Sequence, residues 1–344
     1  MIEDDSEKAR NSILTTAKRI ISLGPICDSC LGRQFAMLAT GFTNAERGRS
    51  LKSVLAMQAC ADDDRAFLEE LAPSFLPARL KLGRKGEDDA PCSVCLGEMA
   101  PANLDLWAKR AAKALDGWDY GTLLVGTRMS GLLAENEELI VADGGSVHAE
   151  PFKSELNREV GKRLSALTGK AVDLKSPDMV VHLNLDKGEV QLQVSSIFIR
   201  GRYRKLVRGI PQTRWPCREC RGRGCQRCEG TGRMYPESVD ELIRPAVMQA
   251  AQAEDTVFHG AGREDIDARM LGSGRPFIVE AVRPRIRKID LALLEQEICR
   301  QAEGKVEVTG LSWADSAMVE RLKEAAFEKT YSAWVRLGGE VAAE

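Results

Sequence analysis

The stretch FHGAGREDIDARMLGSGRPF, residues 258–277, carries six charged side chains among four glycines. Small residues at 260–262 lead directly into a charged tip, Arg263-Glu264-Asp265. A chain that turns on glycine can bring its backbone close to a ligand and point the next side chains into a cleft. The pattern is neither helical nor extended before residues 276–279, which predict the start of a strand. We therefore expect a functional loop that leads into a strand.

At 344 residues the chain is long enough for two or three domains, each with its own core. Its net charge of -2 does not by itself indicate a nucleic-acid partner. The acidic N-terminus is unlike a signal peptide, and no uncharged apolar run reaches membrane-spanning length. We therefore expect a cytoplasmic protein with no membrane partner. In that compartment the ten cysteines favour metal ligation over disulfides.

Two C-x-x-C-L-G motifs supply four of the cysteines, Cys27, Cys30, Cys92 and Cys95. A C-x-x-C turn presents two thiolates to one ion, and two such turns complete a tetrahedral zinc site. The alternatives are two unrelated buried cysteine pairs and a redox pair, which would need a thioredoxin-like strand before the motif, and none is predicted there. We expect the two motifs to share one structural zinc ion.

A second cysteine group is more compact and comprises Cys217, Cys220, Cys225 and Cys228. Its two C-x-x-C turns lie four residues apart with glycine between them. Four thiolates at this spacing can surround one zinc ion with almost no other fold. Five arginines within or beside this knuckle indicate contact with a polyanion, although they are also compatible with simple surface decoration; they are Arg214, Arg218, Arg221, Arg223 and Arg227.

The middle of the chain alternates strand and helix patterns. Residues 122–127 predict a strand, 154–167 an amphipathic helix, and 177–185 with 189–194 a hairpin. The segment 197–205 then runs into a basic stretch, since residues 200–233 hold eleven Lys or Arg and only two acids. This order, with its Gly-Arg-Tyr-Arg-Lys finish, resembles a THUMP domain, an RNA-binding module of tRNA-modifying enzymes. RNA phosphate contact is favoured over a merely solvated face, and the predicted RNA-binding residues are Arg200, Arg202, Arg204, Lys205 and Arg208.

Local patterns predict further elements on both sides of this region. Helices are expected at residues 6–24, 34–38, 44–61, 237–253, 291–302 and 316–327. Strands are expected at 277–282 and 329–337, and residues 305–309 with 311–313 are expected to form a strand and a turn.

Four motifs together resemble one enzyme family. They are C-x-x-C-L-G-R at 27–33, R-W-P-C at 214–217, the loop at 258–277 and K-T-Y-S-A at 329–333. They look like the archaeal and eukaryotic tRNA pseudouridine synthase with an N-terminal THUMP domain, which modifies uridines 54 and 55 of the tRNA T-loop. The resemblance covers nearly all of residues 15–337.

The resemblance implies an α+β protein of several domains. A zinc-bound helical region would cover residues 1–110 and a THUMP-like α/β domain residues 111–210. The four-cysteine knuckle would follow at 211–235, and a mixed α/β pseudouridine synthase catalytic domain at 236–344. The implied partner is tRNA, the chain is expected to be a monomer, and zinc would be structural.

The same resemblance assigns the catalytic aspartate to Asp265, whereas the residues alone leave Glu264 and Asp267 open. A carboxylate can add to uracil C6, capture the ribose as an acylal, or remove the C2′ proton to give a glycal. None of these routes needs a metal or organic cofactor. The target uridine must leave its stack, and the resemblance implies that Arg263 fills the vacated space.

Three more residues complete the expected site. The resemblance implies that Tyr331 stacks on the flipped uracil, the alternative being an edge-strand aromatic packed in the core. Arg269 and Arg275 are expected to contact phosphate or to stiffen the loop.

One departure concerns the C-terminus, because members of the family continue well past the K-T-Y motif and only 13 residues follow Tyr331 here. We expect a C-terminally shortened catalytic domain that binds tRNA but is weakly active or inactive alone. The alternative function is therefore a non-catalytic or truncated zinc-containing tRNA-binding protein.

Overall fold

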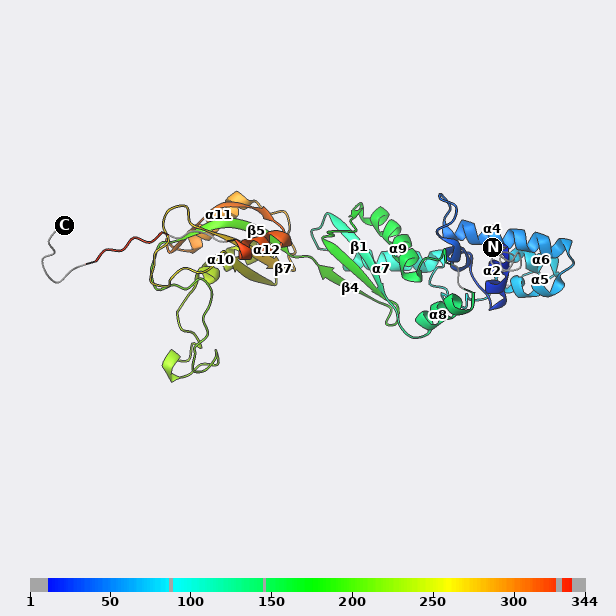
Figure 1. The fold of residues 1–344 in the computed structure, drawn as a ribbon, viewed down its shortest axis with the longest axis horizontal. Helices are drawn as coiled ribbons and strands as arrows, with labels where there is room; N and C mark the ends of the chain where they lie inside the picture. Colours follow the sequence, from blue (N-terminus) through cyan, green and yellow to red (C-terminus); the bar gives the residue numbers. More distant parts are fainter. Residues whose placement is uncertain (1–11, 87–88, 145–146, 326–329, 336–344) are drawn as a thin grey trace, which may run out of the picture. The chain divides into compact units, whose positions relative to one another are not determined.

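The computed structural model describes residues 12–86, 89–144, 147–325 and 330–335. The chain divides into two compact units, Met1–Val194 and Ser195–Glu344 (Figure 1). Each unit has its own buried core. Among the described residues, no helix is both long and apolar enough to cross a membrane.

The first unit begins with short helices and ends with a four-stranded sheet. Its helices are α2 (Ile13–Ser22), α3 (Asp28–Gly32), η1 (Arg33–Phe35), α4 (Asn44–Ala61), α5 (Arg65–Leu71), η2 (Ala72–Ser74), α6 (Leu76–Lys81), α7 (Pro101–Ala114), α8 (Leu132–Gly144) and α9 (Phe152–Thr168). Its strands are β1 (Thr122–Arg128), β2 (Ala171–Val172), β3 (Met179–Asn184) and β4 (Glu189–Val194).

Local signals account for several of these elements. The predicted helix 44–61 is confirmed as α4, which begins with a capping box between Thr43 and Glu46. The predicted helix 34–38 is wrong, because only the single 3₁₀ turn η1 forms there. The predicted helix at 6–24 is present as α2 over Ile13–Ser22, and residues 1–11 lie outside the described part of the chain.

The sheet of the first unit has the order β2-β1-β3-β4, and the predicted hairpin is its β3–β4 pair. Strand β1 runs parallel to both β2 and β3. Alternation buries Met179, Val181 and Leu183 on one face of β3, where α7 and α9 pack. The same core continues into the N-terminal helices. The expected helical region at 1–110 and the THUMP-like domain therefore share one hydrophobic core.

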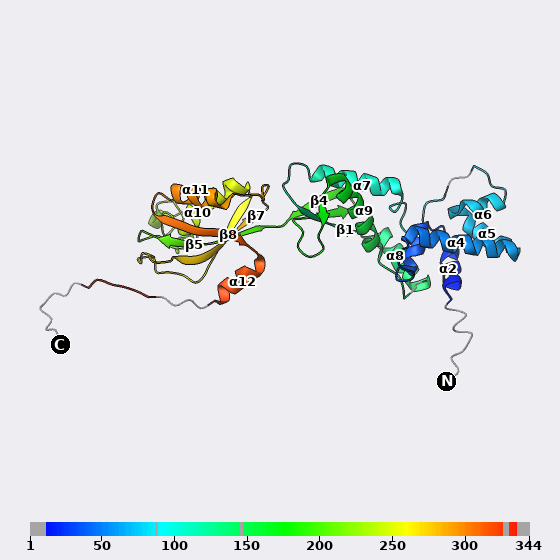
Figure 2. The ribbon, with the colours of Figure 1, turned by 90° about the horizontal axis from the view of Figure 1, so that it is seen from above.

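The second unit is built on an antiparallel sheet of order β6-β7-β5-β8. Helices α10 and α11 cover one face of this sheet and α12 lies on the other (Figure 2). The strands are β5 (Ile197–Lys205), β6 (Asp255–Gly260), β7 (Arg275–Val282) and β8 (Val306–Ala314). The helices are η3 (Gln226–Cys228), α10 (Val239–Ala251), α11 (Leu291–Gln301) and α12 (Ser316–Glu324).

The structure corrects the expected domain boundaries. Residues 197–205 were expected to end the THUMP-like domain at 210, and the catalytic domain to begin at 236. Instead β5 lies between β7 and β8, in the interior of the second sheet. The physical reason is its alternation, which buries Ile197, Ile199 and Tyr203 in the core under α10 and α11. The break between the units falls at Val194.

A second correction concerns the expected strand at 329–337. Residues 330–335 are described, and they form no strand. Tyr331 is 61% exposed and Trp334 fully exposed, so the alternating side chains have no core face to cover. Without a neighbouring strand there is no ladder of hydrogen bonds to hold this segment extended. Residues 329, 336 and 337 lie outside the described part of the chain.

Candidate active site and metal centres

Both ends of the loop between β6 and β7 pack closely against other segments of the second unit. A Cβ added to Gly260 would lie 2.5 Å from Gln212 Nε2, and one added to Gly274 would lie 2.6 Å from the Tyr203 carbonyl oxygen. Gly274 also has a φ of +72°, which side-chain-bearing residues rarely adopt. These two glycines therefore permit a close approach that fixes where the loop leaves and re-enters the sheet.

Glu264 is the anchored acid of this loop, with a side chain only 5% exposed. Its Oε2 accepts a hydrogen bond from Tyr203 Oη at 2.8 Å and lies 3.3 Å from Arg275 Nε. Gln212 Nε2 in turn donates to Tyr203 Oη at 2.8 Å and to the Gly262 carbonyl at 2.9 Å. Burial, and then the neighbouring Glu264 carboxylate, raise the pKa of Tyr203, which keeps its hydroxyl protonated as a donor.

Asp265 differs from its neighbour because its side chain is exposed. Its main chain is nevertheless held, since its carbonyl oxygen accepts from Lys205 Nζ at 2.9 Å and from the Ala268 amide at 3.2 Å. Arg263 and Asp267 are also exposed on this loop. Of the three acids that the sequence left open, Glu264 is engaged in buried contacts, and Asp265 and Asp267 reach solvent.

A cavity of about 280 Å³ lies beside the loop and brings together three of the predicted site residues. Arg269, Arg275 and Tyr331 line it, together with Arg202 and Glu264. Arg275 also donates from Nη1 to the Ala261 carbonyl at 2.7 Å, which links the two ends of the loop. Asp265 and Arg263 are not among the lining residues and lie on the exposed side of the loop.

The predicted RNA-binding residues of β5 lie on opposite faces of the strand. Arg200, Arg202 and Arg204 share the face that is not buried by α10 and α11, and Arg208 is exposed in the turn that follows β5. Lys205 is a correction, because it is fully buried and cannot contact a phosphate directly. Its ammonium donates to the carbonyl oxygens of Ile210, Asp265 and Ile266 at 3.0, 2.9 and 2.9 Å.

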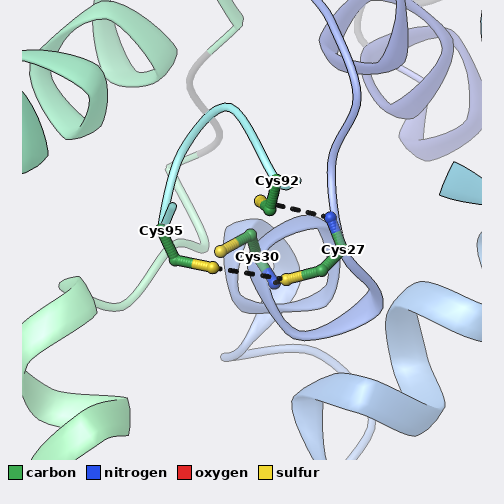
Figure 3. A group of neighbouring side chains, drawn as sticks. All are labelled: Cys27, Cys30, Cys92 and Cys95. Atoms are coloured by element: carbon green, nitrogen blue, oxygen red, sulfur yellow. Dashed lines mark hydrogen bonds between the residues drawn. The ribbon is translucent and has the colours of Figure 1, made fainter. Parts of the chain in front are cut away.

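The first candidate metal centre brings together Cys27, Cys30, Cys92 and Cys95 from two segments that are distant in sequence (Figure 3). Cys27 caps α3, its amide donates to Cys92 Sγ at 3.3 Å, and its sulfur lies 3.8 Å from Cys95 Sγ. Buried Lys52 donates to the Ile26 carbonyl and forms an ion pair with Asp28, and these two residues flank Cys27 in sequence. Buried Arg33 donates to Cys30 Sγ at 3.0 Å.

The second candidate metal centre lies within the knuckle and comprises Cys217, Cys220, Cys225 and Cys228. The amides of Gly224 and Gly232 donate to sulfurs of this group at 3.2 Å. A Cβ on Gly232 would lie 2.4 Å from the Gly222 carbonyl, so glycine is required for the turns to close. The five knuckle arginines are exposed, and within the described residues none forms an ion pair with a carboxylate.

Both groups have the geometry that a tetrahedral zinc ion requires. Bonds of about 2.3 Å to four sulfurs separate those sulfurs by about 3.8 Å. The sulfur pairs at 3.8 Å in the first group and at 3.7–3.9 Å in the second match this spacing. Burial raises the pKa of the Cys30 thiol, so a cation is needed for all four sulfurs of its group to be ionised together. Each group could hold one zinc ion.

Comparison with known families matches both units. The family description "Pus10, C-terminal" matches residues 198–344, and "Pus10 THUMP domain, archaeal" matches residues 107–184. The protein named tRNA pseudouridine synthase Pus10 from Methanothrix thermoacetophila is 60% identical over 328 residues, which cover 94% of this chain and 72% of that protein. The chain belongs to the Pus10 family of tRNA pseudouridine synthases.

Two further Pus10 relatives agree with this assignment. The protein from Halorubrum lacusprofundi is 42% identical over 96% of this chain and 74% of its own length. The protein from Methanopyrus kandleri is 41% identical over 91% of this chain and 72% of its own length. The Pus10 C-terminal match begins within β5, which agrees with the division of the chain at Val194 and not with the expected start of the catalytic domain at 236.

Proposed function

We propose that this chain isomerises uridine to pseudouridine in the T-loop of tRNA, at position 54, position 55 or both, with Asp265 as the nucleophile. The observation that carries the assignment to Asp265 is the contrast between two adjacent acids. Glu264 is buried against Tyr203 and Arg275, whereas Asp265 has an exposed carboxylate on a main chain that is held by Lys205. A nucleophile needs this combination of a free reactive atom and a fixed support.

The reaction breaks the bond between ribose C1′ and uracil N1 and joins C1′ to C5. C5 loses a proton and N1 gains one, so that the product is an isomer and no oxidant is needed. The Asp265 carboxylate would add to uracil C6, capture C1′, or remove the C2′ proton, and each step requires an ionised, accessible oxygen. In this scheme Arg263 fills the space left by the flipped uridine, and Tyr331 stacks on the extruded base beside Arg269 and Arg275.

The proposed tRNA contacts are basic and lie on the second unit. Arg200, Arg202 and Arg204 share one face of β5, with Arg208 beyond its end. The knuckle adds five exposed arginines close to one another in sequence. Zinc held by the four sulfurs would keep these arginines on a rigid support, because the knuckle has almost no apolar core of its own.

The test compares wild type with Asp265→Asn and a matched control, Asp267→Asn, on unmodified tRNA transcript. Both substitutions remove one exposed carboxylate from the same loop, so only the nucleophile assignment predicts a difference between them. Chemical mapping of pseudouridine should show product in the T-loop with wild type and Asp267→Asn, and none with Asp265→Asn. Full product from Asp265→Asn would exclude it as nucleophile. No product from wild type, with tRNA still bound, would select a non-catalytic tRNA-binding protein instead.

A further inference from the structure

Lys205 is a buried cation without an exposed atom, and it lies at the end of the strand that faces the loop. Burying an ammonium group is costly unless its protons are satisfied. All three protons of Lys205 have an acceptor, and all three acceptors are main-chain carbonyl oxygens. Two of them belong to Asp265 and Ile266, so the ammonium holds the backbone of the proposed nucleophile.

Other contacts at the same strand end act on the same segment. The Lys205 carbonyl accepts from the Met270 amide at 2.7 Å, and the Ile266 carbonyl also accepts from the Gly209 amide at 3.0 Å. Residues 265–270 are therefore attached to β5 and to the turn after it through both the side chain and the main chain of Lys205. Burial lowers the pKa of Lys205; the acids Glu264, Asp267 and Asp265 act in the opposite direction and favour its charged form, whereas Arg275 opposes it.

We propose that Lys205 is a positioning residue for the reaction: its buried ammonium fixes the main chain of Asp265, so that the carboxylate points toward the flipped uridine. The inference rests on the proposed role of Asp265. Lys205 does not touch the substrate, because it is fully buried. Its effect is therefore on the rate of the chemical step at bound tRNA and not on tRNA affinity, which distinguishes it from a phosphate-binding lysine.

The first experiment measures single-turnover pseudouridine formation at saturating enzyme, together with the Kd for tRNA, in the full chain. Lys205→Met keeps the length of the side chain but removes the ammonium, and the rate should fall about 100-fold because a small misplacement of a reacting group has an effect of that size. The Kd should change less than twofold. Lys205→Gln retains N–H donors and should lie between Lys205→Met and wild type.

The matched control is Arg79, a buried cation of the first unit that belongs to neither cysteine group. Its Nη1 donates to the Ala72 carbonyl at 3.1 Å and pairs with Asp89 at 2.6 Å, far along the sequence from the loop. Arg79→Met removes a buried, hydrogen-bonded cation and should leave the saturated single-turnover rate within about twofold of wild type. A comparable rate loss in Lys205→Met and Arg79→Met would overturn the positioning role.

Chemical rescue provides a second readout that a general loss of stability would not reproduce. In Lys205→Ala, added ethylammonium can donate hydrogen bonds into the vacated space, whereas tetramethylammonium carries the charge but has no N–H. The rate should rise at least about tenfold with ethylammonium only. This comparison decides the question if Lys205→Met folds poorly, and equal rates with the two cations would contradict the inference.

The outcomes separate the two proposals. Inactive Asp265→Asn together with a normal rate in folded Lys205→Met would overturn the role of Lys205 alone. Fully active Asp265→Asn would overturn the nucleophile and, with it, the positioning of that nucleophile by Lys205.

Discussion

At the residue scale, the acids of the loop at 258–277 differ in their contacts with the rest of the second unit. Glu264, Asp265 and Asp267 are equivalent in charge, and the sequence alone could not rank them. What separates them is the contact of Glu264 with Tyr203 and Gln212, which lie 61 and 52 residues earlier in the chain. Contacts at that separation depend on how the strands pair, and no local pattern reports it.

Substitution of Glu264 should therefore affect stability. Glu264→Gln keeps an oxygen that can accept from Tyr203 but removes the charge that faces Arg275. Loss of one member of a buried ion pair should lower the free energy of unfolding of the second unit by about 3 kcal/mol. Chemical denaturation followed by fluorescence measures this change. Asp265→Asn is the control, and its exposed side chain should alter stability by no more than about 0.5 kcal/mol; equal stability of both variants would refute the anchoring role.

Lys205 could have been predicted as a buried residue. It follows Ile197, Ile199, Gly201 and Tyr203 at intervals of two on one face of β5, and that face is buried. The basic composition of residues 200–208 favoured a solvent-facing assignment for all five cations. Strand alternation separates Lys205 from Arg200, Arg202 and Arg204, and it was the more informative signal here.

At the element scale, local patterns predicted individual helices and strands better than they predicted which strands pair with each other. Helix α4 and the β3–β4 hairpin were predicted because capping and alternation are encoded within each segment. The membership of β5 was not predicted, because it pairs with β7 and β8, which follow it by some 70 to 110 residues. The described residues 330–335 of the alternating segment show the converse, since a strand pattern that pairs with no other strand does not form a strand.

The knuckle arginines should contribute to tRNA binding through charge. Replacing Arg218, Arg221 and Arg227 with Gln removes three charges that have no described ion-pair partner. The slope of log K against log salt concentration should then fall by about 2 to 3, since each phosphate contact contributes about 0.7–0.9. Filter binding across a salt series measures it.

The matched control for the knuckle removes three exposed cations that already pair with a carboxylate. Arg65, Lys162 and Arg300 lie 3.8, 2.9 and 2.6 Å from Glu69, Glu159 and Glu297. Their replacement by Gln changes net charge equally but should leave the salt slope almost unchanged. Equal slopes for the two triple variants would mean that overall charge, and not the knuckle, governs binding.

Helix α9 should make the stability of the first unit depend on pH. Burial raises the pKa of Glu155 to about 7, with Arg33 acting in the opposite direction. The folded state therefore keeps this proton up to about pH 7 while the unfolded state loses it near pH 4.5, so stability falls as pH rises between these values. Glu155→Gln should match wild type near pH 4.5 and exceed it at pH 8 by about 3 kcal/mol. Urea denaturation at several pH values measures the difference.

Glu150 offers a control of opposite sign on the segment just before α9. A bidentate bond from Arg158 lowers the pKa of Glu150, so its contribution to stability is present above the unfolded pKa and is lost as pH falls. Glu150→Gln should therefore be less stable than wild type at pH 8, with the difference closing in acid. Parallel pH dependence in both variants would contradict the assignment of Glu155.

At the scale of the whole molecule, the sequence predicted which motifs and domains the chain contains better than it predicted where one folding unit ends and the next begins. The two four-cysteine groups, the THUMP domain and the charged loop at 258–277 were each predicted from local motifs. The boundary at Val194 was not, because the basic strand β5 follows the THUMP-like hairpin without a linker and reads as its continuation. Only the pairing of β5 in the second sheet shows that a new core begins there.

Because the two units have separate cores, a substitution in one unit should change the stability of that unit without changing the stability of the other. Cooperative unfolding extends as far as a continuous core does, and the first core ends at Val194 while the second begins at Ile197. Glu155→Gln at pH 8 should therefore raise only one thermal transition, and Glu264→Gln should lower only the other. The double variant should show both shifts unchanged, because substitutions without shared partners add. Differential scanning calorimetry resolves the transitions. A single transition that both substitutions move would show that the units unfold together, and the boundary at Val194 would then have no thermodynamic meaning.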